Sequence, residues 1–203
     1  MVYTYLYNAF KCATMQFLRD HFEKLITLTD KEFQYILQFF RSRRIMKKQF
    51  LLQEGDPVTQ EYFVVKGCLK SYVLDSEDRS HIMQFALPDW WISDYQALVT
   101  QSPSSMFLEA VVPTQVLCIT REDKERLCAE MHKMEHFFRI KNAYGYIGLQ
   151  RRILSMLTGS AKERYEQLLQ QYPDLFQVVP KQDLAAFLGV SRETLSRLYS
   201  KNK

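Results

Sequence analysis

Glycine and proline are scarce in this chain, which has six of each among its 203 residues. So few of these two residues argues against long disordered stretches. No apolar run approaches the roughly 20 residues that a helix needs to cross a bilayer. Residues 1–14 are rich in aromatic side chains but lack the basic start and clean apolar core of a signal peptide. We therefore expect a folded, cytoplasmic protein that has no membrane partner.

Cysteine is also rare, and Cys12, Cys68, Cys118 and Cys128 lie far apart. Because no Cys-x-x-Cys pair occurs, a zinc ribbon and an iron–sulfur cluster are not indicated, and we expect buried free thiols. The chain also lacks a Gly-x-Ser-x-Gly turn, a phosphate-binding glycine loop and a His-Glu-x-x-His helix. We therefore expect no catalytic residues, no cofactor and no metal.

The positive charge of the chain is concentrated near its C-terminal end. The net charge is +4, from 27 Lys and Arg against 23 Asp and Glu. Residues 151–203 have nine of the basic and five of the acidic side chains, which leaves 18 of each in residues 1–150. A locally basic surface attracts the phosphate backbone of nucleic acids.

The same region contains the pattern of a helix-turn-helix, from Lys181 to Leu198. Gly189 lies where a first helix must end, because glycine reaches positive φ without steric cost. Ser191 can cap a second helix, and leucines recur on one face of each helix. The alternative is an ordinary helical hairpin with a solvated polar face. The pattern favours a second helix, near residues 191–199, that enters the major groove.

The polar face of that second helix carries residue types that read bases and phosphates. We predict that Arg192 and Arg197 read base edges with help from Glu193, because arginine can bond guanine and glutamate can accept from cytosine. The side chains of Lys181, Ser191 and Ser196 are expected to contact the DNA backbone.

The rest of the chain divides by its hydrophobic period. Residues 15–45 are predicted to be mainly helical, with Thr29 as a helix cap and Glu32 three residues later. From about 46 to 119 the spacing becomes that of short strands, which predicts a small roll or sandwich. Thr120 begins a second helical region, and residues 176–180 are predicted to be extended before the helix-turn-helix.

A long helix without proline is predicted from about 132 to 157. Its apolar stripe of Phe137, Phe138, Tyr144 and Ile147 favours packing against the same helix of a second copy. Packing against its own chain is the alternative.

This order of a β-roll, a long helix and a helix-turn-helix resembles the Crp/Fnr family of bacterial transcription regulators. The glycine-punctuated segments 54–56 and 62–67 look like the family's roll, and residues 163–197 are most similar to Crp-like proteins of Bacteroidetes. The resemblance implies an α+β fold with a cyclic-nucleotide-binding-like jelly roll at residues 15–131, a dimerisation helix at 132–157 and a DNA-binding domain at 158–203. Residues 1–14 are an extension whose order the sequence leaves open. The implied partners are a second copy, palindromic double-stranded DNA and RNA polymerase.

The chain departs from relatives that bind cyclic AMP. Those relatives use a Gly-Glu-Leu turn and a later Arg-Ser or Arg-Thr, where this chain has Ser93-Asp94-Tyr95 and Ser104-Ser105. A buried phosphate without a counter-cation binds poorly, and Ser104 stands where the arginine would be. We expect a small effector other than cyclic AMP in a pocket formed by Ser93, Asp94, Tyr95, Ser104 and Ser105. Two alternatives stay open: a constitutive regulator with a purely structural roll, or a protein-interaction module with weak DNA binding.

Several other residues allow a functional and a structural interpretation. Cys128, His132 and His136 have the spacing of one helix face, but one helix offers no fourth metal ligand. His81 is interpreted as a half-exposed histidine rather than a haem ligand, and Trp90 and Trp91 as core and lid of the roll. The basic cluster of residues 41–44 with Lys47 and Lys48 is expected at a solvated helix end.

Overall fold

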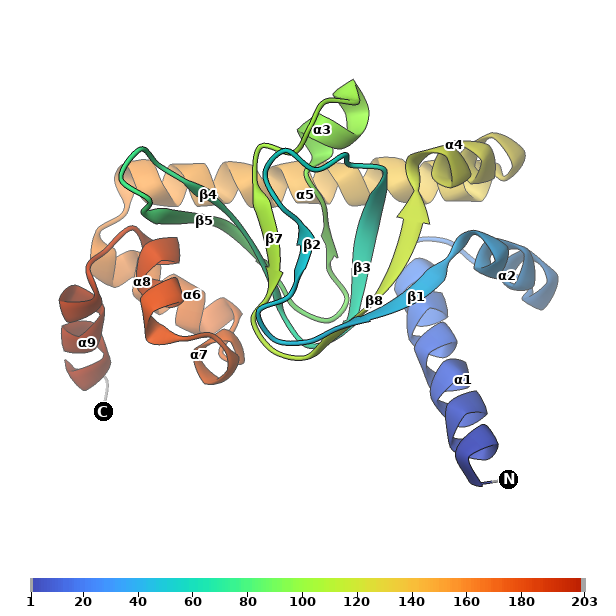
Figure 1. Ribbon diagram of the computed structural model, residues 1–203, viewed down its shortest axis with the longest axis horizontal. Helices are drawn as coiled ribbons and strands as arrows, with labels where there is room; N and C mark the ends of the chain where they lie inside the picture. Colours follow the sequence, from blue (N-terminus) through green and yellow to red (C-terminus); the bar gives the residue numbers. More distant parts are fainter. Residues whose placement is uncertain (1, 202–203) are drawn as a thin grey trace.

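The computed structural model describes the backbone of residues 2–201 and the side chains of residues 13–199. A β-roll forms the middle of the molecule, with the first helices at one end and the last helices at the other (Figure 1). The chain begins with α1 (Val2–Glu23), α2 (Asp30–Ile36) and the short 3₁₀ helix η1 (Leu37–Phe39). Thr29 and Glu32 form the expected capping box at the start of α2. The expected extension at residues 1–14, including Cys12, falls largely outside the described side chains.

Two four-stranded antiparallel sheets make the roll. One sheet has the order β1-β8-β3-β6 and the other β2-β7-β4-β5. Their bounds are β1 (Arg41–Ile45), β2 (Phe50–Leu52), β3 (Gln60–Lys66), β4 (Leu69–Leu74), β5 (Ser80–Ala86), β6 (Trp91–Ile92), β7 (Phe107–Ala110) and β8 (Thr114–Thr120). The short helix α3 (Tyr95–Thr100) follows β6. The strand region and its closing turns therefore confirm the expected roll.

The expectation of a helical segment up to residue 45 is wrong at its end. Residues 41–45 form β1, which pairs with β8, and four of its five side chains are exposed. An exposed edge strand of arginines has no apolar alternation to distinguish it from a polar helix end. The basic cluster of residues 41–48 consequently lies on β1 and on the turn that leads to β2, rather than at a helix end.

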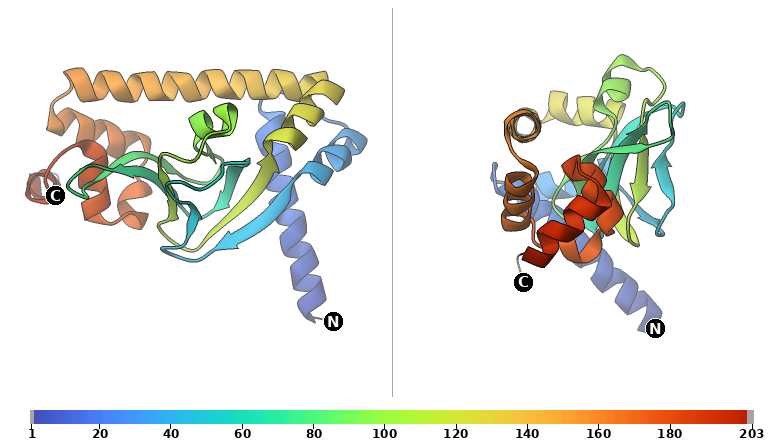
Figure 2. Two further views of the ribbon diagram at one scale, coloured as in Figure 1. Left: turned by 45° about the horizontal axis from the view of Figure 1, so that its top comes forward. Right: turned by 90° about the vertical axis from the view of Figure 1, so that its left-hand side faces the viewer.

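The second helical region begins with α4 (Arg121–Glu130) and continues with α5 (His132–Thr158), α6 (Ala161–Gln171), α7 (Leu175–Val178), α8 (Lys181–Leu188) and α9 (Arg192–Lys201). Thr120 caps α4 as expected, accepting a hydrogen bond from the Asp123 N–H. Residues 176–180 differ from the extended segment that we expected, because the first three of them belong to α7. Figure 2 shows α5 spanning the length of the roll, with α3 beneath its middle.

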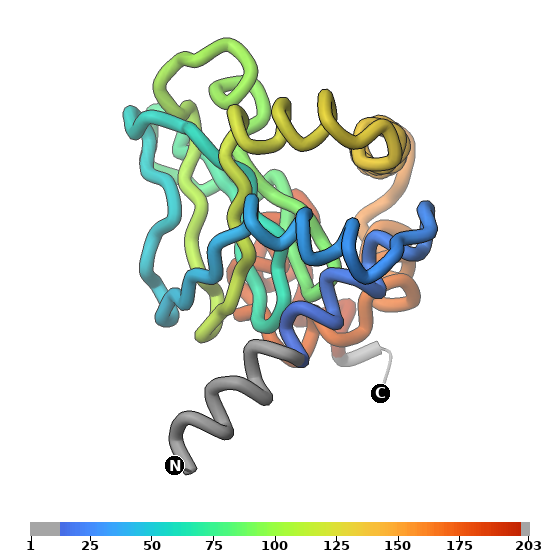
Figure 3. Tube along the Cα trace, turned by 90° about the vertical axis from the view of Figure 1, so that its right-hand side faces the viewer, coloured from blue at the N-terminus to red at the C-terminus, as the bar shows by residue number. Residues whose placement is uncertain are grey.

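The first third of α5 packs against its own chain. Met134, Phe137 and Phe138 are buried in a cluster that also contains Phe22 of α1 and Trp91 of β6. Phe137 and Phe138 therefore belong to the core and do not face a partner, so that part of the expected dimer stripe is wrong. Seen end-on in Figure 3, α5 lies beside the roll, at the upper right of the view.

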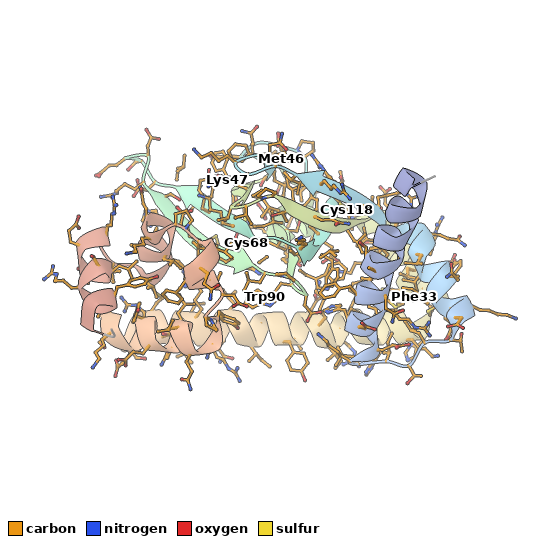
Figure 4. The ribbon with its side chains drawn as sticks, turned by 90° about the horizontal axis from the view of Figure 1, so that it is seen from below. Phe33, Met46, Lys47, Cys68, Trp90 and Cys118 are labelled. Atoms are coloured by element: carbon orange, nitrogen blue, oxygen red, sulfur yellow. The ribbon has the colours of Figure 1, made fainter. Side chains whose placement is uncertain are left out.

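The helix-turn-helix shares a hydrophobic core with the second sheet of the roll. Cys68, Ile82 and Phe85 of the roll lie in one cluster with Leu184 and Leu188 of α8. Figure 4 shows these C-terminal helices gathered at one end of α5, with α1 and α2 at its other end. The helix-turn-helix is thus packed directly against the roll. None of the helices in the described part of the chain is long and apolar enough to span a membrane.

Candidate nucleic-acid interface

The turn between α8 and α9 has the geometry that the sequence predicts. Gly189 has a φ of +65°, and its N–H donates to Ala186 O at 3.3 Å, while the Val190 N–H donates to Ala185 O at 3.0 Å. The Ser191 hydroxyl accepts a hydrogen bond from the Thr194 N–H at 3.1 Å, so Ser191 caps α9. These bonds satisfy backbone groups at both helix ends and fix the direction of α9 relative to α8.

The exposed face of α9 consists of the polar residues that we predicted. Leu195 is buried, whereas Arg192, Glu193, Ser196 and Arg197 are exposed. Hydrogen bonds from its own N–H and from Ser191 lower the pKa of the Glu193 carboxyl, so this side chain stays an acceptor at neutral pH. The structure therefore brings two arginines and a carboxylate onto one solvent-facing surface.

The remaining predicted DNA contacts flank this face. The Lys181 ammonium, in the first turn of α8, lies 4.7 Å from the centre of the Tyr199 ring of α9. The Ser191 oxygen accepts the Thr194 N–H bond and also lies 3.1 Å from the Thr194 hydroxyl oxygen. Both residues lie at the start of a helix, where backbone N–H groups attract phosphate.

Sequence reasoning missed Gln182. An open depression of about 360 Å³ between α8 and α9 is lined by Gln182, Ala185, Ala186, Val190 and Arg192. An amide in the first turn of α8 is a residue type that can donate to a DNA phosphate, and it lines the same depression as Arg192. Its place directly after Lys181 in the pattern was the signal that could have identified it.

The expected effector residues do not all come together. The Asp94 carboxylate accepts hydrogen bonds from the Ala97 and Ser105 N–H groups, both at 3.0 Å, and from the Ser104 and Ser105 hydroxyls, both at 3.2 Å. These bonds lower the pKa of Asp94 although its burial raises it. Ser93 instead donates to Gln60 O at 2.9 Å.

Tyr95 turns away from Asp94 towards β3 and α5. Its hydroxyl lies 3.5 Å from the Lys141 ammonium, and Lys141 is paired at 2.8 Å with the buried Glu61 carboxylate. Lys124 contacts the other oxygen of Glu61 at 2.5 Å. Burial and the nearby Glu61 carboxylate raise the pKa of Tyr95. The five expected pocket residues thus separate into one closed group around Asp94 and two side chains with other partners.

A cyclic nucleotide does not fit the residues present. The Ser104 and Ser105 hydroxyls bond to Asp94 and so do not face a ligand phosphate. Among the described residues no ion pair joins Asp94 to a cation, and the position of the family's phosphate-binding arginine is Ser104. A site that has a carboxylate, no cation and hydroxyl donors that are already bonded is a poor site for the phosphate of a cyclic nucleotide.

The histidines and Cys128, which the sequence left as possible metal or haem ligands, do not form a metal site within the described residues. Cys128 lies on α4 but His132 and His136 lie on α5, so the expected common helix face is wrong. His81 lies 2.8 Å from Asp75 in the exposed β4–β5 hairpin. Within the described residues no group of three or more His, Cys, Asp or Glu side chains could hold a metal ion.

The described cysteines and tryptophans lie mainly in the interior. Cys68 and Cys118 are free and buried, and burial raises their thiol pKa values to about 12 and about 11. Trp91 is a core residue. The half-buried Trp90 meets the Tyr172 ring, with the ring centres 5.0 Å apart.

Comparison with known proteins agrees with this architecture. The family model described as "cyclic nucleotide-binding domain" matches residues 42–131, and the one described as "bacterial regulatory proteins, crp family" matches residues 178–201. The fumarate and nitrate reduction regulatory protein of Vibrio cholerae serotype O1 is 26% identical over 184 residues, 85% of this chain and 73% of that protein.

Two further proteins illustrate the similarity. The anaerobic regulatory protein of Aggregatibacter actinomycetemcomitans is 26% identical over 169 residues, 78% of this chain, and the match spans 65% of that protein's length. The structure of FixK2 from Bradyrhizobium japonicum superposes with a TM-score of 0.69 at 22% identity, covering 80% of this chain and 83% of that one. This structural likeness shows a shared fold.

Proposed function

We propose that this chain, which belongs to the Crp/Fnr family of bacterial transcription regulators, binds double-stranded DNA as a homodimer and reads its sequence with α9. The observation that carries the proposal is the capped α9, whose exposed face presents Arg192, Glu193 and Arg197. Such a helix fits the major groove, where arginine can bond guanine and glutamate can accept from cytosine.

The exposed surface of α5 supports the homodimer. Every residue from 142 to 151 is exposed, so this stretch of helix makes little contact with its own chain. Tyr146, Leu149, Ile153 and Leu157 recur at intervals of three and four and are between 49% and 77% exposed. An exposed apolar stripe of this period matches the seam between two paired helices. Two copies paired along it would present two α9 helices to successive major grooves about 34 Å apart, which requires a palindromic site.

A second candidate function concerns regulation. We expected an effector other than cyclic AMP, but the closure of Asp94 on Ser104 and Ser105 favours a roll that acts without a ligand at this place. In that case DNA affinity would not depend on a small molecule bound there. RNA polymerase remains a proposed partner in the cytoplasm, as the family resemblance implies.

Selection of binding sites from random duplex DNA, followed by fluorescence anisotropy, tests the main proposal. Arg192→Ala should weaken binding to the selected palindrome by about 1–3 kcal/mol and relax preference at one base position. Its binding to scrambled DNA should change little, and Arg151→Ala, an exposed arginine on α5, serves as the control. Equal losses on both DNAs would make Arg192 a phosphate contact. Absence of salt-dependent DNA binding by the wild-type chain would contradict the function itself.

A further inference from the structure

Arg152 of α5 contacts two elements that are distant in the sequence. Its Nη2 atom donates hydrogen bonds to Ile82 O of β5 at 2.9 Å and to Phe187 O of α8 at 3.0 Å. The guanidinium carbon lies 3.6 Å from the centre of the Phe187 ring. One side chain therefore joins the long helix, the roll and the first helix of the helix-turn-helix.

The bond to Phe187 O lies in the last turn of α8, just before the turn that leads to α9. The last carbonyls of a helix have no partner within it and carry the negative end of the helix dipole. Arg152 satisfies Phe187 O, and Arg164 Nε donates to the next carbonyl, Leu188 O, at 2.9 Å. Gly189 and α9 follow directly, so two guanidinium groups hold the segment from which the reading helix starts.

Arg152 has no carboxylate partner among the described residues, and its guanidinium bonds to backbone carbonyls instead. Burial and the neighbouring Arg164 lower its pKa to about 10. A half-buried cation that bonds only to carbonyl oxygens contributes less to stability than a paired one, because its charge is not neutralised. Its directed fork of donors, however, defines the relative orientation of the two backbones that it joins.

Independent contacts hold α8 from the side of the roll. Lys70 of β4 lies 3.0 Å from Asp183 and 3.5 Å from Glu109. The rings of Phe85 and Phe187 are 5.1 Å apart between centres. Contacts with the roll and contacts with α5 therefore hold α8 from two sides.

From this arrangement we infer that Arg152 is a positioning residue for DNA readout, which fixes the orientation of the helix-turn-helix relative to α5 and thereby the half-site spacing that the dimer accepts. The inference rests on the proposed DNA-binding homodimer. In such a dimer α5 is the common axis, so the angle between α5 and α8 determines the separation of the two α9 helices. Base recognition within each half-site remains the task of α9.

The test uses the full chain and duplexes whose two selected half-sites stand at the selected spacing, or one base pair nearer or farther apart. The wild type should prefer one spacing by about tenfold or more, whereas Arg152→Ala should reduce this preference to about threefold or less. Base preference within each half-site should stay unchanged. The matched control Arg151→Ala removes the adjacent, exposed arginine and should keep the wild-type spacing preference.

Retention of the full spacing preference by Arg152→Ala would overturn the inference, and so would a loss of base preference within the half-site. If that variant does not fold, Phe187→Leu removes the ring beneath the guanidinium, keeps the carbonyl and should shift the preference in the same direction. Distances between spin labels on α5 and α9 give a readout without DNA, and Arg152→Ala should broaden them. If the wild type bound no palindrome, the proposed function would fail, while these distances would still decide whether Arg152 positions α9.

Discussion

Gly189 and Met156 are matched in shape where α8 turns into α9. A Cβ atom built on Gly189 would lie 2.8 Å from Met156 Cε, closer than ordinary packing allows. Gly189 also has a φ of +65°, in the left-handed region. The turn of the helix-turn-helix therefore requires glycine mainly for its left-handed conformation, because Met156 Cε is the end of a flexible side chain that can move aside.

Gly189→Ala should lower the free energy of unfolding by about 1–3 kcal/mol, because alanine in the left-handed region costs about 1–2 kcal/mol before any clash. Denaturant unfolding at fixed protein concentration measures it. Adding Met156→Ala to this variant should remove any steric cost of the new Cβ atom. The conformational cost of alanine in the left-handed region should remain. Gly148→Ala is the control, because a Cβ there meets nothing within 4 Å of its own chain and should stabilise the helix by up to about 1 kcal/mol. Equal costs at both glycines would contradict this account.

The exposed apolar stripe of α5 leads to a second prediction, which concerns the dimer. Ile153→Asp places a charge in the middle of the apolar stripe of α5, which is exposed in a single copy. We expect this variant to be a monomer at a protein concentration of roughly tens of micromolar, because a charge buried in a helix–helix interface destabilises it. Sedimentation velocity measures the change. Arg151→Asp puts the same side chain on the opposite side of α5, since two residues are separated by about 200°, and should stay dimeric. A wild-type chain that sediments as a monomer would contradict the dimer.

Calorimetry with cyclic AMP and cyclic GMP tests whether the roll binds a cyclic nucleotide. We expect no binding tighter than about 100 µM, because the Ser104 and Ser105 hydroxyls already bond to Asp94 and no arginine stands at position 104. DNA affinity should be the same with and without these nucleotides. Tighter binding accompanied by stronger DNA association would show that the loop opens to admit a ligand.

The helix-turn-helix could be predicted closely because its signals are local. Gly189, the cap at Ser191 and the leucine spacing each specify backbone geometry within a few residues. The strand β1 could not be distinguished from a helix end, since its exposed arginines lack a hydrophobic period. Phe137 and Phe138 fitted a dimer stripe equally well, and only their contacts with Phe22 and Trp91 assign them to the core.

Other functional features depend on contacts between distant residues. Arg152 reaches Ile82 and Phe187, which lie 70 and 35 positions away, so no spacing rule indicates its role. Ser93 and Tyr95 flank Asp94 in the sequence, yet they bond to β3 and face α5. Alternation of side chains about a strand end separates neighbours in this way, and only the tertiary fold decides which of them meet.

The closed group around Asp94 predicts a specific pH dependence. The pKa of Asp94 in the folded chain lies below its ordinary value of 3.8, because four hydrogen bonds to the carboxylate outweigh its burial. The unfolded chain therefore takes up this proton first as the pH falls. The stabilisation is fully present above about pH 4 and is lost as the pH falls through the folded-state pKa.

Asp94→Asn removes this charge and should lower the free energy of unfolding most at neutral pH, with the difference from wild type narrowing below about pH 4. Urea unfolding between pH 7 and 3 measures it. The difference between the two proteins isolates Asp94 from other carboxylates with lowered pKa values, such as Glu32 at about 2. Asp56→Asn removes a carboxylate from a neighbouring turn, where it accepts from the Gln53 N–H at 2.8 Å, and controls for loss of one charge. A difference between wild type and Asp94→Asn that stays constant down to pH 3 would mean that the hydrogen bonds do not favour the charged form of Asp94.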